Sequence, residues 1–406
     1  MTRPSTSNTA HPQGRQDQGP ANCSDWRHAL AVTLFLLLCV TPLHADNAAD
    51  AFNLLPEKSR DAVARQLSAA GDNRPELLAA VRGAKPEHRP GLAFLLANMP
   101  KRDLTSLSKG YLLENVEYAY RGRVEVPWGR AIPDEIFLND VLPYASVNER
   151  RDNWRRDFYQ RFIGLARECK TPGEAAVRLN QQVFKQLKVQ YHATKRPKPD
   201  QSPYESTKAG YASCTGLSIL LVDACRAVCV PARLAGTPLW TNRTGNHSWV
   251  EVWDGHWHYT GAAEPAPLDT AWFTGIAAKA DPTRPEHRIY AVSWERTGAP
   301  FPLVWDLKIR YVPAVDVTRF YTARRKVAFR VVDRPGGKPV EARLTIRLAG
   351  RIVGHDTVKG PAVFQLAGGQ TYDVEARARG GPATALRKVT LSAEQGQSIE
   401  IPLEKR

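Results

Sequence analysis

A cysteine and a histidine, two residue types that cooperate in covalent catalysis, occur in neighbouring stretches of this chain. Cys214 follows a polar loop and begins the apolar run Ser213-Cys-Thr-Gly-Leu-Ser-Ile-Leu-Leu-Val-Asp-Ala-Cys-Arg-Ala-Val228, which predicts a buried helix. A helix N-terminus carries partial positive charge and free N–H groups, so it stabilises a thiolate and can serve an oxyanion. His247 begins an alternating strand and would act as the base. A cysteine alone is more often a small buried residue, so the interpretation depends on its surroundings.

Three blocks occur in order around this pair: Cys214-Thr-Gly-Leu-Ser, Val230-Pro-Ala-Arg-Leu-Ala-Gly236 and Asn246-His-Ser-Trp-Val-Glu-Val-Trp253, followed by Trp257. They resemble the transglutaminase-like superfamily, which includes transglutaminases, bacterial transglutaminase-like peptidases and peptide:N-glycanases. The resemblance covers residues 170–275. It implies an α+β fold with a papain-like core, in which Cys214 is the nucleophile and His247 is the general base.

The third member of the implied triad departs from the family pattern. The family has an aspartate four residues after the strand tryptophan Trp257, and here that position is Gly261. The nearest acids are Glu264 and Asp269.

The hairpin that carries His247 indicates which acid reaches it. A two-residue turn at Asp254-Gly255 would pair His247 with Ala262 and place Glu264 on the same face of the sheet, diagonal to the histidine. Diagonal neighbours lie about 7–8 Å apart, within reach of a long side chain. Glu264 is therefore the candidate that orients the imidazole, with Asp269 second. A solvated Glu264 at a strand end remains an alternative.

Other polar residues nearby have weaker claims. On the same register His256 and His258 share the face of His247, but no carboxylate cluster stands at ligand spacing, so we expect no metal and no cofactor. Gln201 and Tyr204, in the loop before Cys214, are candidates for an oxyanion-binding side chain. Arg233 is expected to pair with a local carboxylate.

Around this core the chain divides into segments. Helices are predicted near residues 57–70, 74–83, 86–98 and 108–120, followed by a connecting segment over 124–143. Asn148–Phe162 predicts a helix with a solvated arginine face, and Thr171-Pro-Gly-Glu174 is a capping box that opens a helix to about Leu187. Residues 193–209 are expected to form a polar loop.

The sequence pattern changes over the last ninety residues, and the new pattern predicts a small β-sandwich. Short alternating runs separated by glycine-rich turns occur at 326–332, 342–346, 362–366, 372–376, 388–391 and 398–403. The predicted organisation is therefore a signal peptide over 1–45, a helical region over 46–145, the transglutaminase-like core over 146–315 and the sandwich over 316–406.

The N-terminus indicates export. Arg3, Arg15 and Arg27 precede the apolar run Ala29–Val40, which is too short to span a bilayer comfortably but suits a signal peptide. The long polar start leaves an uncleaved membrane anchor as an alternative. In an oxidising compartment Cys169 would be able to pair with Cys225 or Cys229, although spacing does not determine the pairing.

The net charge of +15 would suit an anionic partner. No nucleic-acid-binding motif accompanies it and the basic residues are spread along the chain, so a solvated basic surface is the better interpretation. The resemblance implies an exported enzyme that attacks an amide of a protein or peptide, forms a thioester and transfers the acyl group to water or an amine. Because Gly261 replaces the expected aspartate, a catalytically weakened binding module of the cell envelope is the alternative. The sequence does not indicate an oligomeric state.

Overall fold

The structure, a computed structural model, describes residues 46–394 and 396–404. The predicted signal peptide, with Cys23 and Cys39, lies outside the described residues. Residues Ala48–Arg406 form one compact unit. Within the described ranges, no helix combines the length and apolarity needed to cross a membrane.

The first part of the unit is helical, and each predicted helix has a counterpart there. Proline stands at the first or second position of α3, η2 and α4, where a missing N–H costs nothing. The segment predicted as a plain connection, 124–143, contains the helix α7. The elements are α1 (Asp46–Asn53), α2 (Glu57–Leu67), η1 (Gly71–Asn73), α3 (Arg74–Gly83), η2 (Pro86–His88), α4 (Arg89–Asn98), α5 (Lys101–Leu104), α6 (Lys109–Glu125), α7 (Asp134–Asp140) and α8 (Arg155–Arg167).

The predicted solvated arginine face before and within α8 is wrong at two positions. Arg155 is buried, and its guanidinium donates to the carbonyl oxygens of Val141, Leu142, Pro143 and Arg226. Arg151 is also buried beside the Asp103 carboxylate. A buried charge is tolerated only where it is paired or fully hydrogen-bonded. These two arginines therefore link separate segments of the fold and do not form a solvated face.

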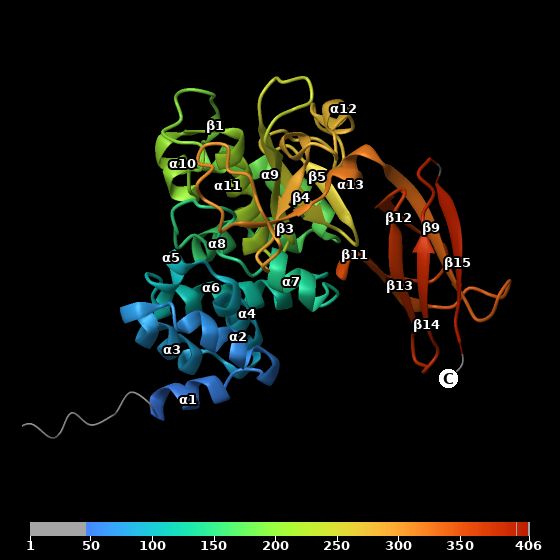
Figure 1. Ribbon diagram of the computed structural model, residues 1–406, viewed down its shortest axis with the longest axis horizontal. Helices are drawn as coiled ribbons and strands as arrows, with labels where there is room; N and C mark the ends of the chain where they lie inside the picture. Colours follow the sequence, from blue (N-terminus) through green and yellow to red (C-terminus); the bar gives the residue numbers. More distant parts are fainter. Residues whose placement is uncertain (1–45, 395, 405–406) are drawn as a thin grey trace, which may run out of the picture. The chain divides into compact units, whose positions relative to one another are not determined.

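The central part contains a six-stranded antiparallel sheet in the order β5-β4-β3-β6-β8-β7. Helices α11 and α9 pack against β4 on this sheet (Figure 1). The segment predicted as a polar loop, 193–209, ends in the helix α10, which Ser202 and Glu205 open with a capping box. The elements are α9 (Pro172–Leu187), β1 (Gln190–Tyr191), α10 (Pro203–Ala209), β2 (Tyr211–Ala212), α11 (Cys214–Ala227), β3 (Ala232–Thr237), β4 (His247–Trp253), β5 (Trp257–Thr260), α12 (Thr274–Ala277), η3 (Pro285–His287), β6 (Tyr290–Val292), β7 (Ala299–Pro300), β8 (Pro313–Asp316) and α13 (Thr318–Thr322).

The register of the β4–β5 hairpin differs from the prediction by one residue. Trp253 pairs with Trp257 and Val250 pairs with Thr260, so the turn contains three residues instead of two. Asp254 N donates to His256 O inside this turn. Since strand residues alternate between faces, the shift moves Gly261 onto the face of His247 and places His258 on the opposite face.

The C-terminal strands (Figure 1) form two sheets, in the orders β11-β10-β13-β14 and β12-β9-β15. The two sheets share one hydrophobic core. Strand β11 was not predicted because its Gly354, His355 and Asp356 are poor strand formers, and pairing with β10 holds it extended. The strands are β9 (Arg324–Val332), β10 (Ala342–Leu348), β11 (Arg351–Val358), β12 (Ala362–Ala367), β13 (Thr371–Ala378), β14 (Thr384–Thr390) and β15 (Gln397–Pro402).

Candidate active site

Cys214 is the first residue of α11, as the sequence predicts. Ser213 caps the helix, because its hydroxyl accepts from Gly216 N at 3.0 Å and itself donates to Pro199 O at 2.6 Å. The N–H groups of the first helical residues have no partner inside the helix, so those of Cys214 and Thr215 are suited to an incoming acceptor. The Cys214 thiol is free and half-buried, whereas the rest of α11 is buried. This is the exposure that a nucleophile needs.

A hydrogen bond between side chains ties the start of α11 to the start of β4. Thr215 Oγ1 and Ser248 Oγ lie 3.0 Å apart, and Ser218 Oγ donates to Ser248 O at 3.2 Å. Cys214 and His247 immediately precede Thr215 and Ser248 in the chain. The fold therefore brings the helix end that carries the thiol to the strand end that carries the imidazole.

His247 lies among aromatic side chains. Its ring centroid is 4.9 Å from that of Trp272, 5.1 Å from Phe273, 5.8 Å from Trp249 and 6.2 Å from Trp240. Burial in these surroundings lowers the pKa of His247 to about 4, so the imidazole is neutral at pH 7. Its Nε2 atom is buried and has no hydrogen-bond partner among the described residues. The histidine therefore lacks the carboxylate contact that a triad acid would supply.

Glu264 places its carboxylate where a side chain at Gly261 would begin. A Cβ atom added to Gly261 would lie 2.2 Å from Glu264 Oε2 and 2.9 Å from Oε1. Gly261 stands where the resemblance implies an aspartate, and the Glu264 carboxylate reaches this position from three residues further along the chain.

The Glu264 carboxylate is bound to a tryptophan in this structure. Trp272 Nε1 donates to Glu264 Oε1 at 3.0 Å, and the same indole contacts the ring of His247. Burial raises the pKa of Glu264, although the bond from Trp272 opposes this shift. Trp272 thus contacts both the Glu264 carboxylate and the His247 ring while remaining 63% exposed.

Asp269, the second candidate acid, has other partners. Its Oδ2 lies 2.7 Å from His258 Nδ1 and 2.7 Å from Arg324 Nη2, and its Oδ1 accepts from Tyr259 N. These contacts hold Asp269 beside His258, whose side chain lies on the face of β5 opposite to His247. The predicted sharing of one face by His247, His256 and His258 is therefore wrong, because the turn is one residue longer than expected.

Asn180 on α9 holds the turn that carries Glu264, and sequence reasoning missed it. Its buried amide nitrogen donates to Gly261 O at 2.8 Å and to Glu264 O at 3.1 Å. Its amide oxygen accepts from Ala263 N at 2.9 Å, at a residue with a left-handed φ of 63°. In the sequence Asn180 is visible only as one residue of the predicted helix that ends near Leu187. No local pattern connects it with residues 261–264.

Replacing Asn180 by alanine is expected to lower the free energy of unfolding by about 3 kcal/mol, because several buried polar groups of the turn lose their partner. Urea unfolding followed by fluorescence measures this. Asn98→Ala is the matched control, since the half-buried Asn98 amide has fewer partners: it donates to Phe94 O in its own helix and accepts from Arg296 N. Equal effects of the two substitutions would contradict the role assigned to Asn180.

The buried neutral imidazole predicts acid sensitivity. The pKa of His247 falls from 6.5 to about 4 on folding, so its contribution is complete above pH 6.5 and is lost as the pH falls toward 4. The full loss amounts to about 3 kcal/mol. In His247→Gln the fall in unfolding free energy between pH 7 and pH 4 should shrink by this amount, as urea titrations would show. An unchanged pH dependence would contradict the burial of the ring.

The remaining polar candidates stabilise the surroundings. Gln201 Nε2 donates to Tyr211 O and Tyr204 OH donates to Asn153 O. Neither hydrogen bond directs the proposed oxyanion donor toward the Cys214 thiol. Arg233 pairs with the buried Glu251 at 2.7 Å, which confirms the expected local ion pair.

The other described cysteines are free and buried. No bridge joins Cys169 to Cys225 or Cys229, so the disulfide that the sequence allows is absent from the described part of the chain. Burial raises the pKa of Cys229 to about 12 and also raises that of Cys225. Across residues 46–394 and 396–404, no group of three or more His, Cys, Asp or Glu side chains is arranged to hold a metal ion.

Comparison with known proteins assigns a family to part of this chain. Residues 163–262, which include Cys214, His247 and Gly261, match the family model of the transglutaminase-like superfamily. This segment is therefore a transglutaminase-like core, and the resemblance stated from the sequence is confirmed.

No curated protein matches the chain. A solved structure described as "a Putative Cysteine Protease from Cytophaga hutchinsonii" is similar at 16% identity with a TM-score of 0.26. The similarity covers 36% of this chain and spans half (50%) of the length of that one.

Proposed function

We propose that this chain is an exported cysteine-dependent amide hydrolase or acyltransferase that acts on protein or peptide substrates. The observation that carries the proposal is the half-buried Cys214 thiol at the capped N-terminus of α11, joined through Thr215 and Ser248 to the strand end that bears His247. The transglutaminase-like core at 163–262 supports the same chemistry.

The reaction follows from these groups. His247 accepts the thiol proton, and the Cys214 sulfur attacks the carbonyl carbon of an amide. The N–H groups at the start of α11 stabilise the oxyanion that forms. As the C–N bond breaks, the imidazolium returns its proton to the leaving amine, and a thioester remains on Cys214. Water or a second amine then attacks the thioester and releases the free thiol.

Glu264 would act by orienting and charging the imidazole. A carboxylate beside His247 Nε2 raises the pKa of the ring and stabilises the imidazolium that forms during the reaction. The carboxylate reaches this position when Trp272 releases it. A substrate that displaces the exposed Trp272 indole would assemble the triad as it binds.

The test is a two-part assay with purified protein. Casein digestion followed by mass spectrometry detects new peptide termini, and incorporation of a fluorescent primary amine into casein detects acyl transfer. We expect one of these activities, abolished by iodoacetamide, and a thioester adduct on Cys214 after acid quenching. Protein that shows neither activity nor an adduct would contradict the proposal.

A second candidate function is a weakly catalytic or inactive binding module of the cell envelope. The unpartnered Nε2 of His247 and the engagement of Glu264 by Trp272 favour it. This candidate requires cell-wall or surface material to bind equally well to wild type and to Cys214→Ala, with no thioester adduct on either protein. Adduct formation would exclude it.

The domain organisation belongs to the same proposal. A helical region over 46–145 and a small β-sandwich over 316–406 would flank the core over 146–315. Export to the periplasm, envelope or medium would follow from a signal peptide over 1–45, with an uncleaved anchor as the alternative. We propose no nucleic-acid partner.

A further inference from the structure

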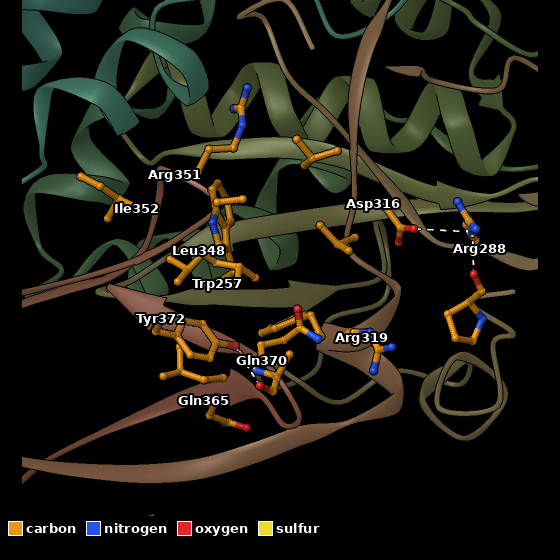
Figure 2. A pocket seen from close by; sticks show the side chains of 18 of the residues that line it. Trp257, Arg288, Asp316, Arg319, Leu348, Arg351, Ile352, Gln365, Gln370 and Tyr372 are labelled. Atoms are coloured by element: carbon orange, nitrogen blue, oxygen red, sulfur yellow. Dashed lines mark hydrogen bonds and ion pairs between the residues drawn. The ribbon is translucent and has the colours of Figure 1, made fainter. Parts of the chain in front are cut away.

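A cavity of about 530 Å³ lies between the central sheet and the C-terminal strands, within the unit Ala48–Arg406 (Figure 2). Neither Cys214 nor His247 lines it. Ligand sites in proteins commonly have volumes of about 300–1,000 Å³, so this cavity can hold one small molecule.

The walls of the cavity are largely apolar. One side comes from the central part of the chain and the other from the β10–β11 hairpin, the end of β12 and the start of β13. The principal apolar side chains are Trp257, Phe320, Leu348, Ile352, Leu366 and Tyr372. Burying an apolar group of a ligand against them would favour binding through the hydrophobic effect.

The charged side chains at the cavity are mostly arginines, and three of them have a carboxylate partner. Arg233 pairs with Glu251, Arg351 pairs with Glu295 at 3.1 Å, and Arg288 lies 3.6 Å from Asp316. In Figure 2 a dashed line joins Arg288 to Asp316, and the guanidinium of Arg351 points away from the other labelled side chains.

Arg319 is the remaining arginine of the cavity. It is exposed and has no carboxylate partner among the described residues. The four arginines at the cavity are thus balanced by three carboxylates, and one positive charge is left at Arg319. A ligand that places a single negative charge there would neutralise the positive charge of Arg319. A guanidinium group binds carboxylates through paired N–H donors.

We propose that this cavity binds a small amphipathic carboxylate, with its apolar body against Trp257 and Leu348 and its carboxylate on Arg319. A medium-chain fatty acid and the free C-terminus of a short apolar peptide share this chemistry. The site uses no residue of the candidate active site, so the proposal is independent of the proposed function and its test requires no activity.

Isothermal titration calorimetry of the full chain tests the proposal with two matched ligand pairs. The first pair is octanoate and octanamide, and the second is N-acetyl-leucyl-leucine and its C-terminal amide. We expect one carboxylate to bind at a ratio of one to one and its amide to bind about 10-fold or more weakly, since a charge-assisted contact is lost. The pair that binds identifies the source of the ligand.

Three variants test whether the ligand binds in this cavity. Arg319→Gln should remove the preference for the carboxylate, and Gln370→Trp should abolish binding by filling the cavity from its half-buried rim. Arg310→Gln, a substitution of an exposed arginine outside the cavity, should leave binding unchanged. Equal binding of acid and amide, the same affinity in Arg319→Gln and wild type, or no binding of any probe would overturn the proposal.

Discussion

Replacing Cys214 by alanine is expected to lower the rate of amide cleavage or acyl transfer by at least about 10³-fold, because the thiols of the other described cysteines are buried and cannot reach a substrate. The fold should survive, since the half-buried thiol is not part of a packed core and the Ser213 cap remains. Steady-state kinetics on the substrate identified with casein, together with circular dichroism, measures both effects.

Cys169→Ala is the matched control for this substitution. Cys169 is a buried free cysteine whose sulfur donates to Leu165 O, and its pKa is raised by burial, so its removal should leave the rate within about twofold. Iodoacetamide at pH 6 should label Cys214 ahead of Cys225 and Cys229, whose thiols are buried. Normal turnover by Cys214→Ala would refute the nucleophile, and similar losses in both variants would indicate a folding defect.

The second large effect concerns the acid. Glu264→Ala is expected to lower kcat by about 10²-fold or more, because His247 would lose the carboxylate that orients and charges it. In this background Gly261→Asp should restore kcat to within about 10-fold of wild type. The restored carboxylate would project from the position that Glu264 now fills, 2.2 Å from the site of the new Cβ atom.

The single substitution Gly261→Asp is the control for the double variant, in which Glu264→Ala is combined with Gly261→Asp. The atoms it would meet are the far end of the flexible Glu264 side chain, and Gly261 has no left-handed φ, so the backbone accepts the new residue. The pH profile of kcat/KM should recover its wild-type shape in the double variant. Failure of Gly261→Asp to rescue Glu264→Ala, with both proteins folded, would mean that Glu264 does not act as the triad acid.

Asp223 is a further polar residue that the sequence reasoning did not use. It is fully buried in α11, both carboxylate oxygens lack a hydrogen-bond partner in the described chain, and burial raises its pKa well above the usual value. A raised carboxyl pKa lowers the free energy of unfolding as the pH rises above the pKa of the unfolded chain. Its position in the core indicates a structural role.

The predicted features that agree with the structure are the local ones. The apolar run after Ser213 specifies α11 and places Cys214 at its first turn, since capping and helical burial depend on neighbouring residues. The capping residue Thr171 opens α9 in the same way, with its hydroxyl accepting from Glu174 N. The order of the cysteine, Pro-Ala-Arg and histidine blocks is also a property of the chain itself, and it identified the core.

The tertiary structure decided which residues meet. The three-residue turn at Asp254–His256 moved Gly261 onto the face of His247, and no short-range signal separates it from a two-residue turn. Asn180 binds the Gly261–Glu264 turn across about eighty residues of sequence, and Trp272 binds the carboxylate of Glu264 while its ring contacts His247. The sequence by itself therefore determined the class of the core and led to the proposed nucleophile and base, because each depends on a local pattern. The position of the proposed acid was decided only by packing between distant segments, since a strand register and a side-chain contact are set by the partners that folding brings together.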